Sequence, residues 1–281
     1  MSVIRVDNTV ERGTSLDIHN TISLIDSTSR RRSEQELGLT PAELQSLMKV
    51  AVVVEGLHDE VVFSHLLRKE LNAAVAGIFP LRGGAKAPTL LEAKLLIDGS
   101  AVPILVVLDN TVQEEIEPIW TEIVSLAEAG DMEKARALAD EKLRGVDELT
   151  YLKELARAGI ESDGLGRVRF FGVRRPDVIC YLPEDLILNR CAADQDWEWD
   201  KLIEDFLGAE QARKIQQGKS FRPRSIKKFL SSHPSSSNPC FPAETKLVNE
   251  AIEAAAVRAA RAGRERHEDL NELAAKILEL S

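Results

Sequence analysis

Two apolar runs, each ending in an acid, dominate the hydrophobic pattern of the chain. Residues 50–54 read Val-Ala-Val-Val-Val and are followed by Glu55 and Gly56, and residues 104–108 read Ile-Leu-Val-Val-Leu and are followed by Asp109. Continuous runs of this length and composition predict strands that are covered on both faces, as in parallel α/β sheets. Since such sheets bind ligands at the carboxyl ends of their strands, Glu55 and Asp109 are the first candidate functional residues.

The segments around these runs alternate between helical and extended patterns. Helices are predicted at about 59–71 and 89–97, and further strands at 75–81, 167–173 and 177–182. Strands that alternate with helices predict right-handed βαβ units and a parallel sheet. The predicted fold class is therefore α/β.

Long polar and Ala-rich stretches divide the rest of the chain. Residues 112–160 predict two or three helices inserted after the Asp109 strand, and residues beyond 192 predict helices at 197–207, 209–217, 225–230 and 243–280. We expect an N-terminal leader at 1–48, with short strands at 4–6 and 16–24 and a helix at 40–48, packed on the core. An α/β domain at 49–190 and a helical C-terminal region at 191–281 follow.

Composition places the chain among ordinary globular proteins. Hydrophobic residues make up 44% and charged residues 29% of its 281 residues, and no apolar run approaches the roughly 18 residues of a membrane helix. With no signal-peptide pattern at the N-terminus, we expect a cytoplasmic protein without a membrane partner. Cys180, Cys191 and Cys240 lack zinc-ligand spacing and predict reduced thiols.

The formal net charge of −10 argues against a surface that attracts nucleic acid everywhere. It leaves room for a local basic groove. A group of carboxylates that holds a divalent cation also contributes negative charge while the cation is absent. The charge is therefore compatible with a metal-dependent enzyme.

Three motifs follow one another in a recognisable order. They are Glu55-Gly56-Leu57-His58-Asp59, the pair Gly83-Gly84, and Asp109-Asn110-Thr111. This set resembles the Toprim domain that topoisomerases, primases and the nucleases of the overcoming-lysogenization-defect (OLD) family share. The resemblance covers about half of the chain, roughly residues 50–188, and implies a Toprim-like, Rossmann-like parallel sheet flanked by helices.

The resemblance also implies roles for individual residues. Glu55 would be a metal ligand or general acid/base, Asp109 would bind the metal, and Asp59 would support the site. Glu184 and Asp185 stand where nuclease-type members supply further acids, and Lys227 would be the late lysine that completes the site. Carboxylate oxygens suit Mg²⁺ or Mn²⁺ as hard ligands.

The pair Gly83-Gly84 is a candidate phosphate-binding turn. A Gly83-Gly84 turn would let backbone amides approach a phosphate group, with Arg82 and Lys86 nearby as counter-charges. The same glycines also suit an ordinary turn.

One position departs from the family. Thr111 stands where Toprim proteins carry a second acid two residues after the first. A hydroxyl there removes one carboxylate ligand, and Glu184 and Asp185 could compensate for it. Asp59 and Glu184, each taken alone, are equally compatible with helix caps or surface charges.

The most basic stretch of the chain lies at residues 220–229. It contains Arg222, Arg224, Lys227 and Lys228 interleaved with Phe221 and Phe229. This pattern suits a nucleic-acid strand, with cations on phosphates and rings stacked on bases. It also suits a helix whose cationic face is merely solvated.

Two features bear on partners. No GxxxxGK[ST] motif occurs in the sequence, so an ATPase of the kind that accompanies OLD-family Toprim domains would be a separate polypeptide. The Ala-rich helix from residue 243 onward has a small-residue face that suits either internal packing or a homo-oligomer.

Three functional hypotheses result. The first is a divalent-metal-dependent nuclease that cleaves DNA or RNA. The second is a catalytically degenerate Toprim-like binding or regulatory protein, motivated by Thr111. The third is a phosphatase of the haloacid-dehalogenase kind with Asp109 as nucleophile, which leaves Glu55 without a role.

Overall fold

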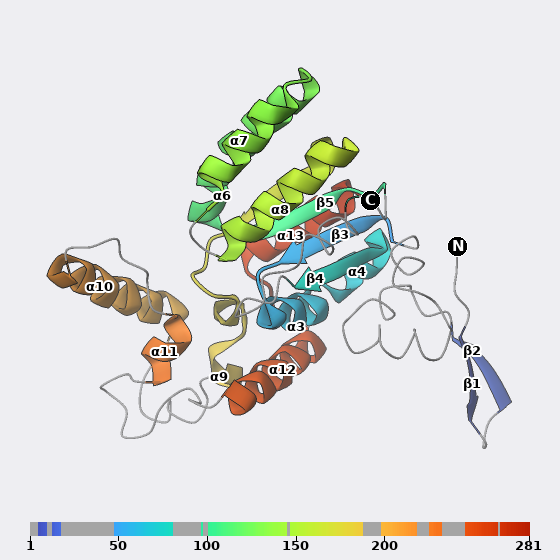
Figure 1. Ribbon diagram of the computed structural model, residues 1–281. Coiled ribbons are helices and arrows are strands. Elements are labelled where there is room, and N and C mark those ends of the chain that lie inside the picture. Colours follow the sequence, from blue (N-terminus) through green and yellow to red (C-terminus); the bar gives the residue numbers. More distant parts are fainter. Residues whose placement is uncertain are drawn as a thin grey trace. The chain divides into compact units, whose positions relative to one another are not determined.

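The computed structural model describes ten stretches of the chain (Figure 1). They are residues 5–9, 13–17, 48–80, 97, 101–144, 147–187, 198–217, 225–231, 245–263 and 265–281. The chain divides into two compact units. The first unit contains Met1–Glu60, Leu67–Val173 and Glu268–Ser281, and the second contains Val61–Leu66 and Arg174–His267.

A four-stranded parallel sheet forms the centre of the first unit. Its order is β4-β3-β5-β6, and all three strand pairs are parallel. The strands are β3 (Val50–Val54), β4 (Ala76–Pro80), β5 (Ile104–Asp109) and β6 (Val168–Val173). The predicted α/β class and these four predicted strands are confirmed.

The position of each strand explains its sequence. β3 and β5 are the two central strands, and the apolar residues of both are buried, as expected for strands covered on two faces. β6 lies at an edge and alternates, with Val168 and Phe170 buried and Arg169 exposed.

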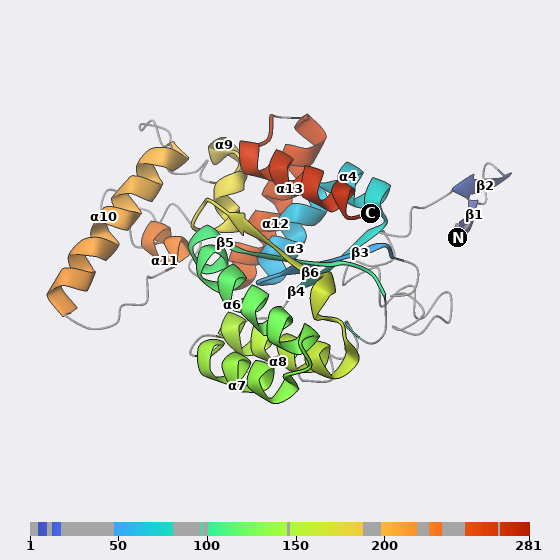
Figure 2. The ribbon, with the colours of Figure 1, turned by 90° about the horizontal axis from the view of Figure 1, so that it is seen from above.

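Helices cover both faces of the sheet (Figure 2). On one side lie α6 (Asn110–Glu128), α7 (Met132–Lys142) and α8 (Asp147–Ser162), which confirm the predicted helical insertion. On the other side lie α4 (Arg68–Ala74) and α13 (Glu268–Glu279). The first unit is thus a three-layer α/β structure.

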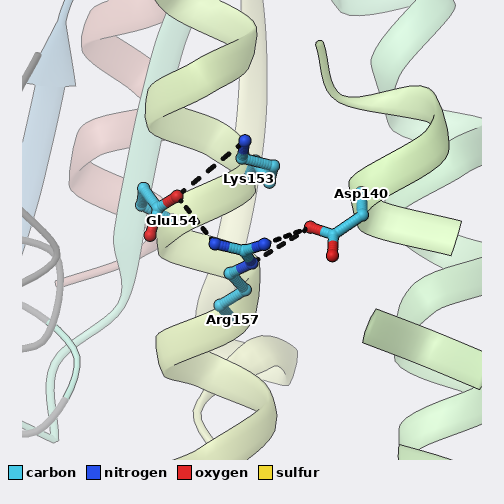
Figure 3. Close-up of polar contacts among 4 residues, drawn as sticks. All are labelled: Asp140, Lys153, Glu154 and Arg157. Atoms are coloured by element: carbon cyan, nitrogen blue, oxygen red, sulfur yellow. Dashed lines mark hydrogen bonds and ion pairs between the residues drawn. The ribbon is translucent and has the colours of Figure 1, made fainter. Parts of the chain in front are cut away.

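Aromatic and small residues pack the insertion onto the sheet. The rings of Trp120 on α6 and Phe170 on β6 meet edge to face, with centroids 5.4 Å apart. Ala135 and Ala139 of α7 are buried. Arg157 on α8 reaches across to Asp140 on α7, with Nη2 2.7 Å from Oδ1, and also contacts Glu154, which Lys153 approaches from the other side (Figure 3).

The helix predicted at 59–71 is two helices. α3 (Leu57–Leu66) ends before Leu67, whose φ of −107° and ψ of 17° interrupt the helical geometry, and α4 begins at Arg68. Leu67 is fully buried, so packing of its side chain in the core stabilises the interruption between the two helices. The hydrophobic pattern of the sequence does not predict this interruption. α4 then ends at Val75 in a left-handed conformation.

The second unit is helical and contains no strand among its described residues. It contains Val61–Leu66, the later part of a helix that begins at Leu57 in the first unit. Its other elements are η3 (Val178–Tyr181), α9 (Glu184–Ile187), α10 (Trp199–Gln217), α11 (Ile226–Ser231) and α12 (Thr245–Ala262). The strand predicted at 177–182 is wrong, because the Asp177 carboxylate accepts a hydrogen bond from Ile179 N and stabilises a 3-10 turn instead. A second 3-10 turn, η2 (Leu165–Arg167), precedes β6 in the first unit.

Two glycines differ from their predicted roles, Gly208 at a predicted helix boundary and Gly263 inside a predicted helix. α10 runs continuously through Gly208, where two helices were predicted. The run predicted at 243–280 is instead broken at Gly263, whose φ of +61° is a conformation that glycine adopts without steric cost.

A hairpin near the N-terminus pairs β1 (Arg5–Thr9) with β2 (Gly13–Asp17) in antiparallel register. Arg5 and Val6 of the strand predicted at 4–6 lie in this hairpin, as do Leu16 and Asp17 of the strand predicted at 16–24. The other residues of these two predicted strands lie outside the described residues. The helices predicted at 40–48 and 89–97 fall almost entirely outside the described residues. None of the helices that the structure describes is long and apolar enough to cross a membrane.

Candidate functional site

The carboxyl edge of the sheet, where β3 and β5 end, carries two of the predicted acids. β3 and β5 are adjacent and parallel, and their last paired residues are Val53 and Val106. Counting two residues on from this pair reaches Glu55 on one strand and Leu108, the neighbour of Asp109, on the other. Backbone pairing alone therefore brings Glu55 and Asp109 to the same edge of the sheet.

Glu55 and Gly56 form the turn between β3 and α3. The Glu55 side chain is exposed. Gly56 does not have the positive φ that favours glycine, and a Cβ placed on it would come no closer than 3.6 Å to its nearest neighbour, Asp59 Oδ2. The fold therefore does not require a glycine here.

Asp59 begins α3 with a hydrogen bond to the preceding turn. Gly56 N donates to Asp59 Oδ2 at 2.8 Å, which is the half of a capping box in which the third helical residue reaches back to the N-cap. A carboxylate in the first turn is also favoured by the helix dipole. The structure thus gives Asp59 the role of a helix cap.

The remaining predicted residues of this edge are only partly described. The backbone of Asp109 closes β5 opposite Val173, but neither its side chain nor that of Thr111 is described, and Arg82, Gly83, Gly84 and Lys86 lie outside the described residues. Among the side chains that are described, no three His, Cys, Asp or Glu residues converge as metal ligands. The donors that fit Mg²⁺ or Mn²⁺ at this edge are the carboxylates of Glu55 and Asp109, which are hard oxygen ligands.

The second unit contains an ion pair that involves the predicted Lys227. Lys227 Nζ lies 2.8 Å from Asp177 Oδ1, and the two side chains are only 20% and 13% exposed. The same oxygen accepts a hydrogen bond from Ile179 N at 3.1 Å. Lys227 therefore connects α11 to the η3 turn, because Asp177 contacts both the Lys227 side chain and the backbone N–H of Ile179.

Arg175 and Cys180 lie beside this pair. Arg175 Nη2 is 3.0 Å from Asp200 Oδ1. Cys180 is a free, buried thiol, as predicted. Burial raises the pKa of the Cys180 thiol and the charge of Asp177 raises it further, while Arg175 and Lys227 lower it in part. A raised pKa disfavours the thiolate, which is the reactive form of cysteine.

Glu184 contacts the start of α10. Trp199 N, at the first residue of that helix, donates to Glu184 Oε1 at 3.0 Å, and Trp199 Nε1 donates to Leu182 O at 2.6 Å. Glu184 thus satisfies one of the backbone N–H groups that a helix start leaves unpaired. Asp185 follows in α9 with an exposed side chain.

The predicted site residues fall in both units. Glu55, Asp59 and Asp109 belong to the first unit, and Glu184, Asp185, Lys227 and Lys228 belong to the second, while Arg222 and Arg224 lie outside the described residues. The sequence did not single out Arg175, Asp177 or Asp200. The pair Pro176-Asp177 ahead of an apolar segment was the available signal, since Asp commonly caps such turns.

Charge is distributed unevenly along the chain. Residues 110–163, which span the helical insertion, contain 14 acidic and 6 basic residues. Residues 174–267, nearly all of the second unit, contain 16 basic and 14 acidic residues. The net charge of −10 therefore derives mainly from the insertion and does not weigh against anion binding by the second unit.

Comparisons with protein-family models, with curated proteins and with solved structures found no match for this chain. The Toprim resemblance therefore rests on the motifs of the sequence and stays a prediction.

Proposed function

We propose that this protein is a divalent-metal-dependent nuclease that hydrolyses phosphodiester bonds of nucleic acid. The observation that carries the proposal is the pairing of β3 with β5, which brings two acids, Glu55 and Asp109, to one edge of a parallel sheet. Ligands of open α/β sheets bind at this edge. Glu55 and Asp109 would hold Mg²⁺ or Mn²⁺.

In the proposed reaction the metal ion would activate the phosphodiester, and the residues at the end of β3 would position the metal ion. A bound divalent ion would polarise the phosphodiester and favour attack by water. The side chain of Glu55, directly after β3, is exposed. Asp59 fixes the turn after β3 by accepting a hydrogen bond from Gly56 N.

The test is cleavage of end-labelled single- and double-stranded DNA and RNA with Mg²⁺, with Mn²⁺ and with chelator. Loss of even an outer partner of a metal ligand costs about 10- to 100-fold, so Glu55→Gln should lower the rate by at least about 100-fold. Glu128→Gln, at an exposed acid of α6, is the matched control and should retain full activity.

A second readout separates metal binding from turnover. Mn²⁺ affinity, measured by electron paramagnetic resonance, should fall in Glu55→Gln and stay unchanged in Glu128→Gln. Equal cleavage by wild type and Glu55→Gln would overturn the proposal. Hydrolysis of a generic phosphate monoester with no cleavage of nucleic acid would favour the phosphatase hypothesis instead.

A binding protein without turnover is the second candidate. Two observations favour it: Thr111 stands where Toprim nucleases carry an acid, and an Asp59 oxygen is engaged by Gly56 N. Such a protein would bind oligonucleotides with or without metal and leave them intact. If Thr111→Asp then produced metal-dependent cleavage, the edge would be a nuclease site that has lost one ligand.

A further inference from the structure

Arg175 in the second unit has hydrogen-bond donors that no described residue of the protein accepts. Its Nη2 contacts Asp200, but Nε and Nη1 are buried and have no hydrogen-bond partner in the part of the chain that the structure describes. A guanidinium carries five N–H donors and no acceptor. Burying such donors unpaired is unfavourable, so the group gains stability from any anion that satisfies them.

The present partner of Arg175 is easily displaced. The Asp200 side chain is 86% exposed, whereas that of Arg175 is 14% exposed. Water and salt screen an exposed carboxylate, which makes such an ion pair weak. A phosphate oxygen arriving at this place could therefore compete with Asp200 for the guanidinium.

A second cation, Lys227, lies near Arg175. Lys227 is bound to Asp177, and both Lys227 and Arg175 lie close enough to Cys180 to lower the pKa of its thiol against the effect of burial. In the sequence, Lys227 belongs to a stretch, residues 219–228, that contains five basic residues and no acid. A negatively charged strand that contacted Arg175 would also be attracted by Lys227.

We propose that Arg175 binds a backbone phosphate of a nucleic-acid strand through the fork of its guanidinium, displacing Asp200. Arginine suits this role because two of its N–H groups can pair with two phosphate oxygens. Protein atoms cover Nε and Nη1 in the present arrangement, so binding includes a movement of the guanidinium toward the exposed position of Asp200. The inference rests on the proposed function for its ligand and names a residue that contacts that ligand.

The test measures binding of a fluorescent single-stranded oligonucleotide by the full chain, in chelator and at several salt concentrations. Arg175→Met should raise the Kd about tenfold and reduce the slope of log K against log salt by about 0.7, the value for one lost phosphate contact on a single strand. Arg175→Lys should recover part of the affinity, since it keeps the charge without the fork. Arg136→Met, which removes an exposed cation paired with Glu161 on the insertion, is the control and should bind like wild type.

Thermal unfolding of the same variants separates binding from a structural role. Methionine removes the unpaired donors and keeps the apolar stem, so Arg175→Met should unfold at the same temperature as wild type or higher. A lower unfolding temperature with unchanged affinity and salt slope would show that Arg175 serves only its ion pair, and would overturn the inference.

Two further outcomes separate this inference from the nuclease proposal. Weakened binding by Arg175→Met in a protein without metal-dependent cleavage would support the inference and overturn the nuclease. Metal-dependent cleavage with binding unaffected by Arg175→Met would support the nuclease proposal and overturn the inference about Arg175. Inorganic phosphate that displaced the oligonucleotide at equal phosphate concentration would overturn the preference for a strand.

Discussion

The acids of the two units are positioned by different physical means. At the carboxyl edge of the sheet, Glu55 and Asp109 are brought together by the backbone pairing of two buried strands. In the second unit, Asp177 and Glu184 each accept a hydrogen bond from a backbone N–H. An acid after an apolar segment can thus have either role, and the nearest donor decides which.

The difference follows from what each unit uses to satisfy its backbone. A sheet pairs the N–H and C=O groups of its strands with one another, so the strand ends do not depend on side chains. Short helices and turns leave terminal N–H groups unpaired, and acidic side chains fill them. The irregular 174–187 segment therefore uses its carboxylates for its own stability.

The Asp177–Lys227 pair should give the largest change in stability. Asp177→Ala removes both the ion pair and the bond to Ile179 N and leaves a partly buried lysine unpaired, so it should cost about 2 kcal/mol of unfolding free energy. Lys227→Met should cost less. Denaturant unfolding of both single variants and the double variant gives their coupling energy, about 0.5–3 kcal/mol for residues in contact.

The nuclease activity of a further variant, Lys227→Arg, tests whether Lys227 has only a structural role. If Lys227 has only the structural role, Lys227→Arg retains activity because arginine keeps the ion pair with Asp177. A loss of activity in Lys227→Arg, at unchanged stability, would assign Lys227 to the catalytic residues. Lys134→Met, which removes an exposed lysine paired with Asp131 on the helical insertion, is the control.

Substitution of Glu184 should lower the free energy of unfolding by an intermediate amount, and it tests whether this acid caps α10 or binds metal. Glu184→Ala removes the acceptor of Trp199 N and should cost about 1 kcal/mol, as for other caps. Glu184→Gln keeps an acceptor and loses only the favourable charge at the start of α10, about 0.5 kcal/mol. Weaker Mn²⁺ binding by Glu184→Gln would contradict the capping role and return Glu184 to the metal ligands.

Arg157 on the helical insertion should give the smallest effect. Its ion pairs with Asp140 and Glu154 are partly exposed, so Arg157→Ala should cost about 0.5 kcal/mol, and less at high salt. The hydrogen bond to Asp140 raises the pKa of Arg157; this contribution is complete at neutral pH and is lost only as pH rises past the ordinary guanidinium pKa. A loss equal to that of Asp177→Ala would show that burial does not distinguish the two pairs.

The sequence predicted the sheet because its signal is local. Val50 to Val54 and Ile104 to Asp109 carry runs that fit buried strands, and four of the predicted strands are present. The break at Leu67 depends on core packing, and the turn at Asp177 depends on a side-chain hydrogen bond. Neither feature changes the apolar periodicity from which elements are predicted.

For the candidate site too, the sequence predicted the features that depend on strands and missed those that depend on side-chain contacts. Strand ends gave Glu55 and Asp109 from the order of the chain alone. The bond between Asp59 and Gly56, and the contact between Glu184 and Trp199 fifteen residues later, depend on side-chain conformations and on the folding of loops. A one-dimensional pattern contains neither.

The return of α13 to the first unit has a consequence for synthesis. Leu270, Leu273 and Ile277 of α13 are buried, and the helix belongs to the same unit as β3, although the second unit is translated between them. Domains generally fold as units while the chain is being made, N-terminal first. Here one face of the sheet stays incompletely covered until α13 has left the ribosome, so folding of the first unit cannot be completed before then. The residues of the second unit have all emerged earlier.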